Sequence, residues 1–230
     1  MLYELRIYSI PPGRMADIQA RTLGAVPPLF AEHGMKAVGY WTVVAGRRLP
    51  AFAYILEWRD AAHQEASWRA FGADERWRRL RAESNARSEL VEDYALSLLR
   101  PNPDWPGGFQ AAPDPAPEEV HDLVSHEAAL GHNQAVTDHL LREVLPIFQA
   151  AGGRVLAVFD AVAGPVMPAV SYILAWPDYA RRAAGWSAFN TAAVLRARAE
   201  DHPARFRRRL LGGGDVYLMA PVAWPARSAP

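Results

Sequence analysis

The chain has 230 residues, half of them hydrophobic, and its 25 Lys and Arg residues balance 25 Asp and Glu residues. A zero net charge excludes the electrostatic pattern of a general nucleic-acid binder, so we expect no nucleic-acid partner, and the apolar content excludes a disordered chain. Because there is no cysteine, a disulfide framework, a thiolate metal site and a thiol nucleophile are also excluded.

The first half of the chain predicts the order strand, helix, strand, strand, helix, strand. Strand segments alternate or are rich in β-branched and aromatic residues, whereas helical segments place their apolar residues on one face. Pro27-Pro28 should kink or divide the first helix, Gly34 suits its C-terminal cap, and residues 46–50 suit a hairpin connection. The six predicted segments are residues 2–9, 14–33, 36–45, 51–58, 61–84 and 91–99.

A repeat relates this half to the rest of the chain. A shift of 118 positions aligns residues 28–71 with residues 146–189 without a gap, and 18 of these 44 pairs are identical. The second half therefore predicts the same order of elements. Its predicted strands are residues 120–127, 154–163, 168–176 and 214–220, and its predicted helices are residues 132–151 and 178–209.

Prolines and glycines between the two copies predict a linker without regular structure. We expect a first domain at 1–101, the linker at 102–118, a diverged second domain at 119–221 and a C-terminal tail at 222–230. No stretch approaches the roughly 18 apolar residues of a membrane span, and the N-terminus lacks a signal-peptide core. We therefore expect a cytoplasmic protein with no membrane partner.

The order of elements predicts an α+β fold of two ferredoxin-like βαββαβ repeats. Each repeat forms a four-stranded antiparallel sheet with both helices on one face, which leaves the other face bare. Two such sheets can cover one another by facing each other as an α/β barrel. We expect this pairing within one chain, while a homodimer or higher homo-oligomer that pairs equivalent copies stays open.

Several separated motifs of the first copy resemble the NIPSNAP family. The motifs are Tyr3-Glu4-Leu5-Arg6-Ile7-Tyr8, Pro12-Gly13-Arg14, His33-Gly34-Met35-Lys36, Val38-Gly39-Tyr40-Trp41, Ala73-Asp74-Glu75-Arg76-Trp77 and Leu99-Arg100-Pro101. The resemblance covers essentially the whole first copy and implies the dimeric α/β-barrel superfamily, which includes cofactor-free monooxygenases, isomerases and haem proteins. It does not imply a particular reaction.

The second copy departs from these motifs. Val124 and His126 stand where the first copy has Arg6 and Tyr8, and Phe159 replaces Trp41. These departures indicate that the second copy is mainly structural.

Alternation along the first strand places Glu4, Arg6 and Tyr8 on one face. If the apolar face meets the helices, the polar face points between the sheets, where Arg6 could hold a carboxylate or an enolate oxygen. The alternative is a structural ion pair between Arg6 and an acid such as Glu4. Other candidates for lining that cavity are aromatic: Tyr40, Trp41, Tyr54 and Trp58.

The recurrence of Tyr54 and Trp58 as Tyr172 and Trp176 favours a core role against the helices. Glu57 lies on the opposite face of its strand. It would be a base with its pKa raised by burial if that face is enclosed, and a solvated acid if it is exposed.

Histidine supplies the remaining candidates. His33 ends the first helix, where a capping role competes with a catalytic one. His132 and His139 are seven positions apart, which does not match the spacing of helical metal ligands, so we expect no metal site. We expect no cofactor, although no local spacing decides for or against haem.

Two functions fit these observations. The space between the sheets could bind a small, partly apolar molecule, with Arg6 and Tyr8 orienting it for cofactor-free oxidation or isomerisation and Glu57 or His33 moving a proton. The alternative is a non-enzymatic binding or scaffold protein in which the aromatic residues only pack. The first function requires an enclosed pocket reached by these side chains, and a solid apolar core there counts against it.

Overall fold

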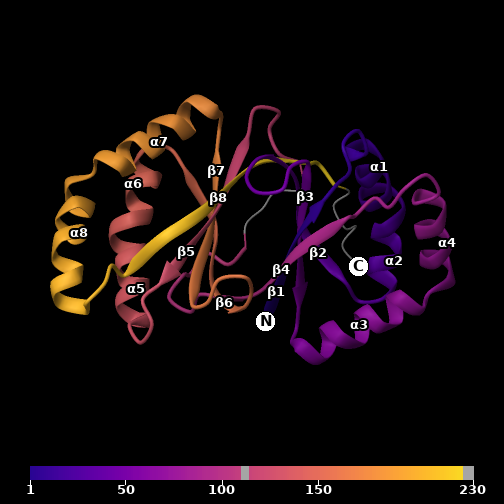
Figure 1. Ribbon diagram of the computed structural model, residues 1–230, viewed down its shortest axis with the longest axis horizontal. Helices are drawn as coiled ribbons and strands as arrows, with labels where there is room; N and C mark the ends of the chain where they lie inside the picture. Colours follow the sequence, from indigo (N-terminus) through magenta and orange to yellow (C-terminus); the bar gives the residue numbers. More distant parts are fainter. Residues whose placement is uncertain (110–113, 225–230) are drawn as a thin grey trace.

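A computed structural model describes residues 1–109 and 114–224 of the chain. Eight antiparallel strands close into one barrel in the order β1-β3-β2-β8-β5-β7-β6-β4, and the helices of the two halves lie at opposite sides of it (Figure 1). The strands are β1 (Leu2–Ser9), β2 (Lys36–Ala45), β3 (Ala51–Trp58), β4 (Asp93–Pro101), β5 (Val120–Ala128), β6 (Arg154–Ala163), β7 (Ala169–Trp176) and β8 (Leu211–Pro221). The predicted α+β fold of two βαββαβ repeats is confirmed.

The two halves close the barrel by pairing the edge strands of their two sheets. Strand β2 pairs with β8, with Trp41 opposite Pro221, and β4 pairs with β6, with Pro101 opposite Phe159. Each join therefore links one strand of the first half to one of the second. Because closure leaves no strand edge unpaired, the predicted pairing within a single chain is the one the structure adopts.

The first helical region of each half has the same three parts. In the first half these are α1 (Met15–Gln19), the π-helical segment η1 (Ala20–Ala25) and α2 (Val26–Glu32), and in the second half α5 (Asn133–His139), η2 (Leu140–Val144) and α6 (Leu145–Ala150). Pro27-Pro28 and Pro146 lie in the first turns of α2 and α6. A proline lacks the N–H that continues the preceding helix, so the wider turn forms just before it. The predicted interruption is thus confirmed.

The second helical region of each half is a pair of helices. Asp60 caps α3 (Ala61–Ala73) by accepting the His63 N–H at 2.7 Å, and Asp178 caps α7 (Tyr179–Thr191) by accepting the Arg181 N–H at 2.7 Å. Helices α4 (Glu75–Ser84) and α8 (Ala193–Phe206) follow. A side-chain cap satisfies a backbone donor that the helix itself leaves unpaired, so the repeated aspartate fixes both starts.

Three apolar clusters result. One fills the middle of the barrel and draws residues from both halves, and each of the other two lies between the outer face of one half's strands and that half's helices. Most strands therefore contribute apolar side chains to a cluster on each face. None of the helices within the described residues is long and apolar enough to cross a membrane.

Candidate functional site

The polar face of β1 points toward the helices, so the predicted orientation is wrong. Tyr3 and Leu5 belong to the cluster inside the barrel, whereas Glu4 accepts hydrogen bonds from Gln64 and Trp68 of α3. Alternation along β1 does not show which face is the interior one, because this strand packs against other residues on both faces. The apolar residues of β1 lie inside the barrel, and its polar residues lie on the helix side. Arg6 and Tyr8 lie on the helix side with Glu4 and cannot orient a molecule between the sheets.

The middle of the barrel is filled with side chains. Trp41 lies there, 1% exposed, and its Nε1 donates to Nδ1 of His121 at 2.8 Å. A cavity of about 500 Å³ occupies one end, lined in part by Ser97, Ser125 and Tyr217. The expectation of one cavity shared by Trp41, Tyr40, Tyr54 and Trp58 is therefore wrong, because Trp41 faces the barrel while the other three pack under the helices.

Glu4 is a completely buried carboxylate at the centre of the helix-side layer. It accepts hydrogen bonds from Trp58 Nε1 at 3.1 Å, Trp68 Nε1 at 3.0 Å and Gln64 Nε2 at 2.7 Å. Arg6 Nε donates to its second oxygen at 2.5 Å. A buried charge needs such pairing, and the predicted structural ion pair of Arg6 and Glu4 exists. Each carboxylate oxygen of Glu4 already accepts a hydrogen bond from a side chain of this protein.

Arg6 is held by aromatic rings as well as by Glu4. Its guanidinium carbon lies 4.1 Å from the centre of the Trp68 ring and 5.2 Å from that of Tyr94. Burial opposes the charged form, but Tyr54, Tyr8 and Glu4 together raise the pKa of Arg6 above its ordinary value. The guanidinium therefore stays positive and helps to anchor α3 to the sheet.

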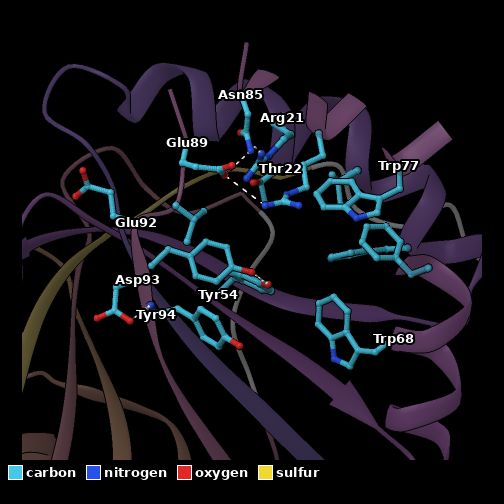
Figure 2. Close-up of a pocket in the computed structure, with 16 residues that line it drawn as sticks. Arg21, Thr22, Tyr54, Trp68, Trp77, Asn85, Glu89, Glu92, Asp93 and Tyr94 are labelled. Atoms are coloured by element: carbon cyan, nitrogen blue, oxygen red, sulfur yellow. Dashed lines mark hydrogen bonds and ion pairs between the residues drawn. The ribbon is translucent and has the colours of Figure 1, made fainter. Parts of the chain in front are cut away.

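A cavity of about 330 Å³ lies between this sheet and the helices of the first half; we call it the first cavity (Figure 2). Its walls come from β1, β3 and β4 on one side and from η1, α2, α3 and α4 on the other. Most of the lining is apolar or aromatic, including Val26, Phe30, Trp68, Phe71 and Trp77. Such a lining suits an apolar ring system.

Two tyrosines form the polar part of the sheet wall. The hydroxyls of Tyr8 and Tyr54 are 2.5 Å apart, and both residues line the first cavity. Burial, and next the neighbouring Tyr8, raise the pKa of Tyr54 well above its ordinary value. The Tyr54 hydroxyl therefore stays neutral, and its hydrogen bond with Tyr8 lies on the cavity wall. Tyr54 packs on the helix side, as its recurrence favoured, and it lines the first cavity rather than the space between the sheets.

Arg21 is one of two arginines on the opposite wall; the other, Arg81, pairs with Glu89 at 3.4 Å. Arg21 is 8% exposed, and its Nη1 donates to Ser84 Oγ at 3.2 Å and Asn85 Oδ1 at 3.1 Å. Burial lowers the pKa of Arg21, with Tyr8 acting in the opposite direction. No carboxylate within the described residues forms an ion pair with this guanidinium, so its charge is available to a ligand.

We did not predict Arg21 as a site residue from the sequence, although its position in the helical pattern could have indicated it. It lies three positions after the buried Ile18 and five before Val26, on the apolar face of the first helical region. A basic residue on a buried helical face requires a partner or a ligand. Thr22 and Trp77, which also line the first cavity, carried no comparable signal.

The other predicted site residues lie away from the first cavity. His33 ends α2, as the capping prediction requires, and its Nε2 is 2.9 Å from Asp74 Oδ2. Glu57 faces the barrel at its rim, where Lys36 Nζ donates to it at 2.7 Å and the Tyr3 hydroxyl at 3.2 Å. Neither residue lines the first cavity. A catalytic role for either residue would therefore require a substrate bound outside the first cavity.

Metal chemistry has no obvious site in the part of the chain that the structure describes. There, no three His, Asp or Glu side chains lie close enough together to hold a metal ion. The first cavity therefore offers hydrogen bonds from the Tyr8 and Tyr54 hydroxyls and charge from two arginines and three acids, within walls that are largely aromatic.

Comparison with known proteins agrees with the motifs of the first half. The family model described as NIPSNAP matches residues 3–106. The first half of this chain is a NIPSNAP domain. A NIPSNAP domain protein from Burkholderia xenovorans is 21% identical over 46% of this chain and 99% of its own, with a TM-score of 0.39. No curated protein matches the chain.

Solved structures also resemble the whole two-domain barrel. A candidate monooxygenase from Lactobacillus acidophilus is 11% identical, covers 96% of this chain and 93% of its own, and has a TM-score of 0.57. An anthrone oxidase-like protein is 14% identical, covers 100% of this chain and 96% of its own, and also has a TM-score of 0.57. At such low identity these likenesses show that the NIPSNAP domain and its diverged copy share the fold of these proteins.

Proposed function

We propose that the NIPSNAP domain binds a small aromatic molecule with a weakly acidic hydroxyl or enol, and that it promotes oxidation of this molecule by dioxygen. The observation that carries the proposal is that a buried guanidinium, Arg21, and the hydrogen-bonded hydroxyls of Tyr8 and Tyr54 line the same aromatic-walled cavity. This combination favours a flat apolar body with one oxygen that can become an anion.

The walls define the body of the ligand. Phe30, Trp68, Phe71 and Trp77 offer ring edges and faces, and the volume of about 330 Å³ suits a compound of a few fused rings rather than a polymer. Aromatic pairs gain roughly 0.5–1.5 kcal/mol beyond the burial of apolar area. An aromatic ligand is therefore preferred over an aliphatic one of equal size.

The polar groups define its oxygen. Arg21 forms no ion pair with a carboxylate among the described residues, and the Tyr54 hydroxyl stays neutral because burial raises its pKa. A phenolate or enolate oxygen placed between them would receive charge-assisted hydrogen bonds, worth roughly 1.5–3 kcal/mol each. Stabilising the anion lowers the pKa of the bound substrate.

Such an anion can transfer one electron to dioxygen, and the two radicals then join in a new C–O bond as a peroxide. Cleavage of the O–O bond with loss of water leaves a ketone, so that anthrone and one dioxygen give anthraquinone and one water. Two whole-chain structural neighbours support the proposal of an oxidation: one is a candidate monooxygenase, and the other is anthrone oxidase-like. The acid–base roles first considered for Glu57 and His33 are not part of the proposal, because both lie outside the first cavity.

The test uses anthrone as the probe and anthracene, which lacks the oxygen, as the control ligand. Binding is measured by titration of tryptophan fluorescence, and oxidation by oxygen uptake. Arg21→Met and Tyr54→Phe should each weaken anthrone binding and slow oxygen uptake, by about tenfold for Arg21→Met if one charged hydrogen bond is lost. Tyr172→Phe changes the equivalent tyrosine of the second half and is the matched control.

Equal binding of anthrone and anthracene, or unchanged binding by the Arg21→Met and Tyr54→Phe variants, would refute the proposed site. Specific binding without oxygen uptake would refute the oxidase step and favour the non-enzymatic binding role. Conversion of the ligand to an isomer without oxygen uptake would favour an isomerase at the same cavity.

A further inference from the structure

The second half contains a cavity in the place equivalent to the first cavity. It has a volume of about 470 Å³ and lies between the outer face of β5 and β8 and the helices α5, η2, α7 and α8; we call it the second cavity. His126 and His139 line it at the positions that Tyr8 and Arg21 occupy in the first half. The fold has kept the cavity while its chemistry has changed.

The charges of the two cavities differ. The first cavity is lined by two arginines and three acids, so its charges are mixed. The second is lined by Arg196, Arg198 and Arg209, and none of its described lining residues is an aspartate or a glutamate. A cavity lined by charges of one sign attracts a ligand of the opposite sign.

Two of these arginines are available to a ligand. Arg198 pairs with Glu143, its Nη2 lying 2.9 Å from Oε1. Arg196 and Arg209 are exposed, and no ion pair within the described residues involves either of them. The structure therefore leaves two guanidinium groups on the lining of the second cavity without an acidic partner in the described chain.

The inner end of the second cavity is apolar or neutral. Val144, Phe189 and Leu195 contribute apolar side chains. His126 Nε2 lies 3.1 Å from the Tyr172 hydroxyl, and burial lowers the pKa of His126. A neutral imidazole adds polarity to the inner wall without adding charge.

We propose that the second cavity binds a small apolar molecule that carries one carboxylate group. The apolar body lies against Val144, Phe189 and Leu195, and the carboxylate is held by Arg196 and Arg209. A guanidinium matches the geometry of a carboxylate through two parallel hydrogen bonds. This site does not rest on the function proposed for the first cavity. Its ligand is a carboxylate that is already charged in solution, whereas the ligand proposed there is a weak acid that ionises only on binding.

The test is calorimetric titration of the full chain with naphthoate and with the neutral naphthamide, which has a similar shape. Naphthoate should bind more tightly, and Arg196→Gln combined with Arg209→Gln should weaken its binding by about tenfold or more. Arg142→Gln removes one exposed positive charge outside the cavity and should leave naphthoate binding unchanged. Ala199→Trp, which fills the second cavity, should abolish binding.

Arg81→Gln, at the position of the first cavity equivalent to Ala199, separates the two sites and should leave naphthoate binding unchanged. Urea unfolding of each variant checks that it still folds. Because Arg196 and Arg209 are exposed, we expect the double variant to keep the stability of the parent chain. Equal affinity for naphthoate and naphthamide, unchanged naphthoate binding in the double variant, or loss of binding with Arg81→Gln would each overturn the proposal.

Discussion

Glu4 of β1 and Asp122 of β5 occupy the same position in the two halves, and each is a completely buried carboxylate bonded to two tryptophans. For Asp122 the donors are Trp176 Nε1 at 3.0 Å and Trp186 Nε1 at 2.7 Å, with Arg182 Nε at 2.7 Å as the cation. In both halves, one indole comes from the sheet and the other from the helix that follows it. The carboxylate thus ties the helix to the sheet.

Removal of either carboxylate should strongly destabilise the fold. Glu4→Ala leaves two indole N–H groups and the Arg6 charge without their acceptor, and breaking such a buried pair costs about 3–5 kcal/mol. Urea denaturation measures the change in the free energy of unfolding. Glu65→Ala, which removes an exposed ion pair with Arg69, is the control and should cost less than about 1 kcal/mol. Similar losses in both variants would contradict this account.

Two helical glycines should respond to alanine in opposite directions. A Cβ at Gly185 of α7 would lie 2.2 Å from the Trp176 ring, whereas a Cβ at Gly72 of α3 meets nothing within 4 Å. Gly185→Ala should therefore destabilise by about 1–3 kcal/mol through overpacking. Gly72→Ala should stabilise by about 0.5 kcal/mol, because alanine loses less backbone entropy in a helix. Thermal unfolding compares them, and a loss of stability with Gly72→Ala would show that this reasoning fails.

The histidines of the second cavity should make the fold less stable in mild acid. Burial lowers the pKa values of His126, His139 and His202 in the folded state, below the value of about 6.5 expected when unfolded. Below pH of about 6.5 the unfolded chain then binds more protons than the folded chain, so stability falls as the pH falls and is fully present only above that value. The charged side chains near His139 and His202 are Glu143, Arg198 and Asp201.

Urea denaturation across this range measures the effect. His139→Gln and His202→Gln should each reduce the loss of unfolding free energy between pH of about 7.5 and about 5.5, because each removes one proton-linked group. If both variants keep the full pH dependence of the parent chain, other groups are responsible.

An isolated first half should not remain a monomer. A fragment of residues 1–109 leaves β2 and β4 without their partners β8 and β6 and exposes the apolar face that fills the barrel. Exposed strand edges and a bare apolar face favour association. Light scattering after size-exclusion chromatography should show a dimer or a larger species. A monomeric fragment with the strand content of the full chain would argue that closure of the barrel contributes little.

The sequence alone predicted most of the local structure. The bounds of β2, β3 and β6 agree with the predicted segments at 36–45, 51–58 and 154–163. These predictions depend on hydrophobic period, glycine and proline, all of which act over a few neighbouring residues. The predicted linker at 102–118 and tail at 222–230 are only partly within the described residues, because 110–113 and 225–230 lie outside them.

The repeat determined the architecture for a physical reason: two homologous sheets each have a face that must be covered, and one chain supplies both. Only the tertiary structure decided which face of β1 turned inward, because both faces of a closed barrel strand are buried and alternation cannot distinguish them. Glu4 and Arg6 turned toward the helices because their partners Gln64 and Trp68, some 60 residues away, satisfy them there. Because of this long-range pairing, the candidate site lies in the layer beneath the helices and not in the space between the sheets, where the sequence predicted it.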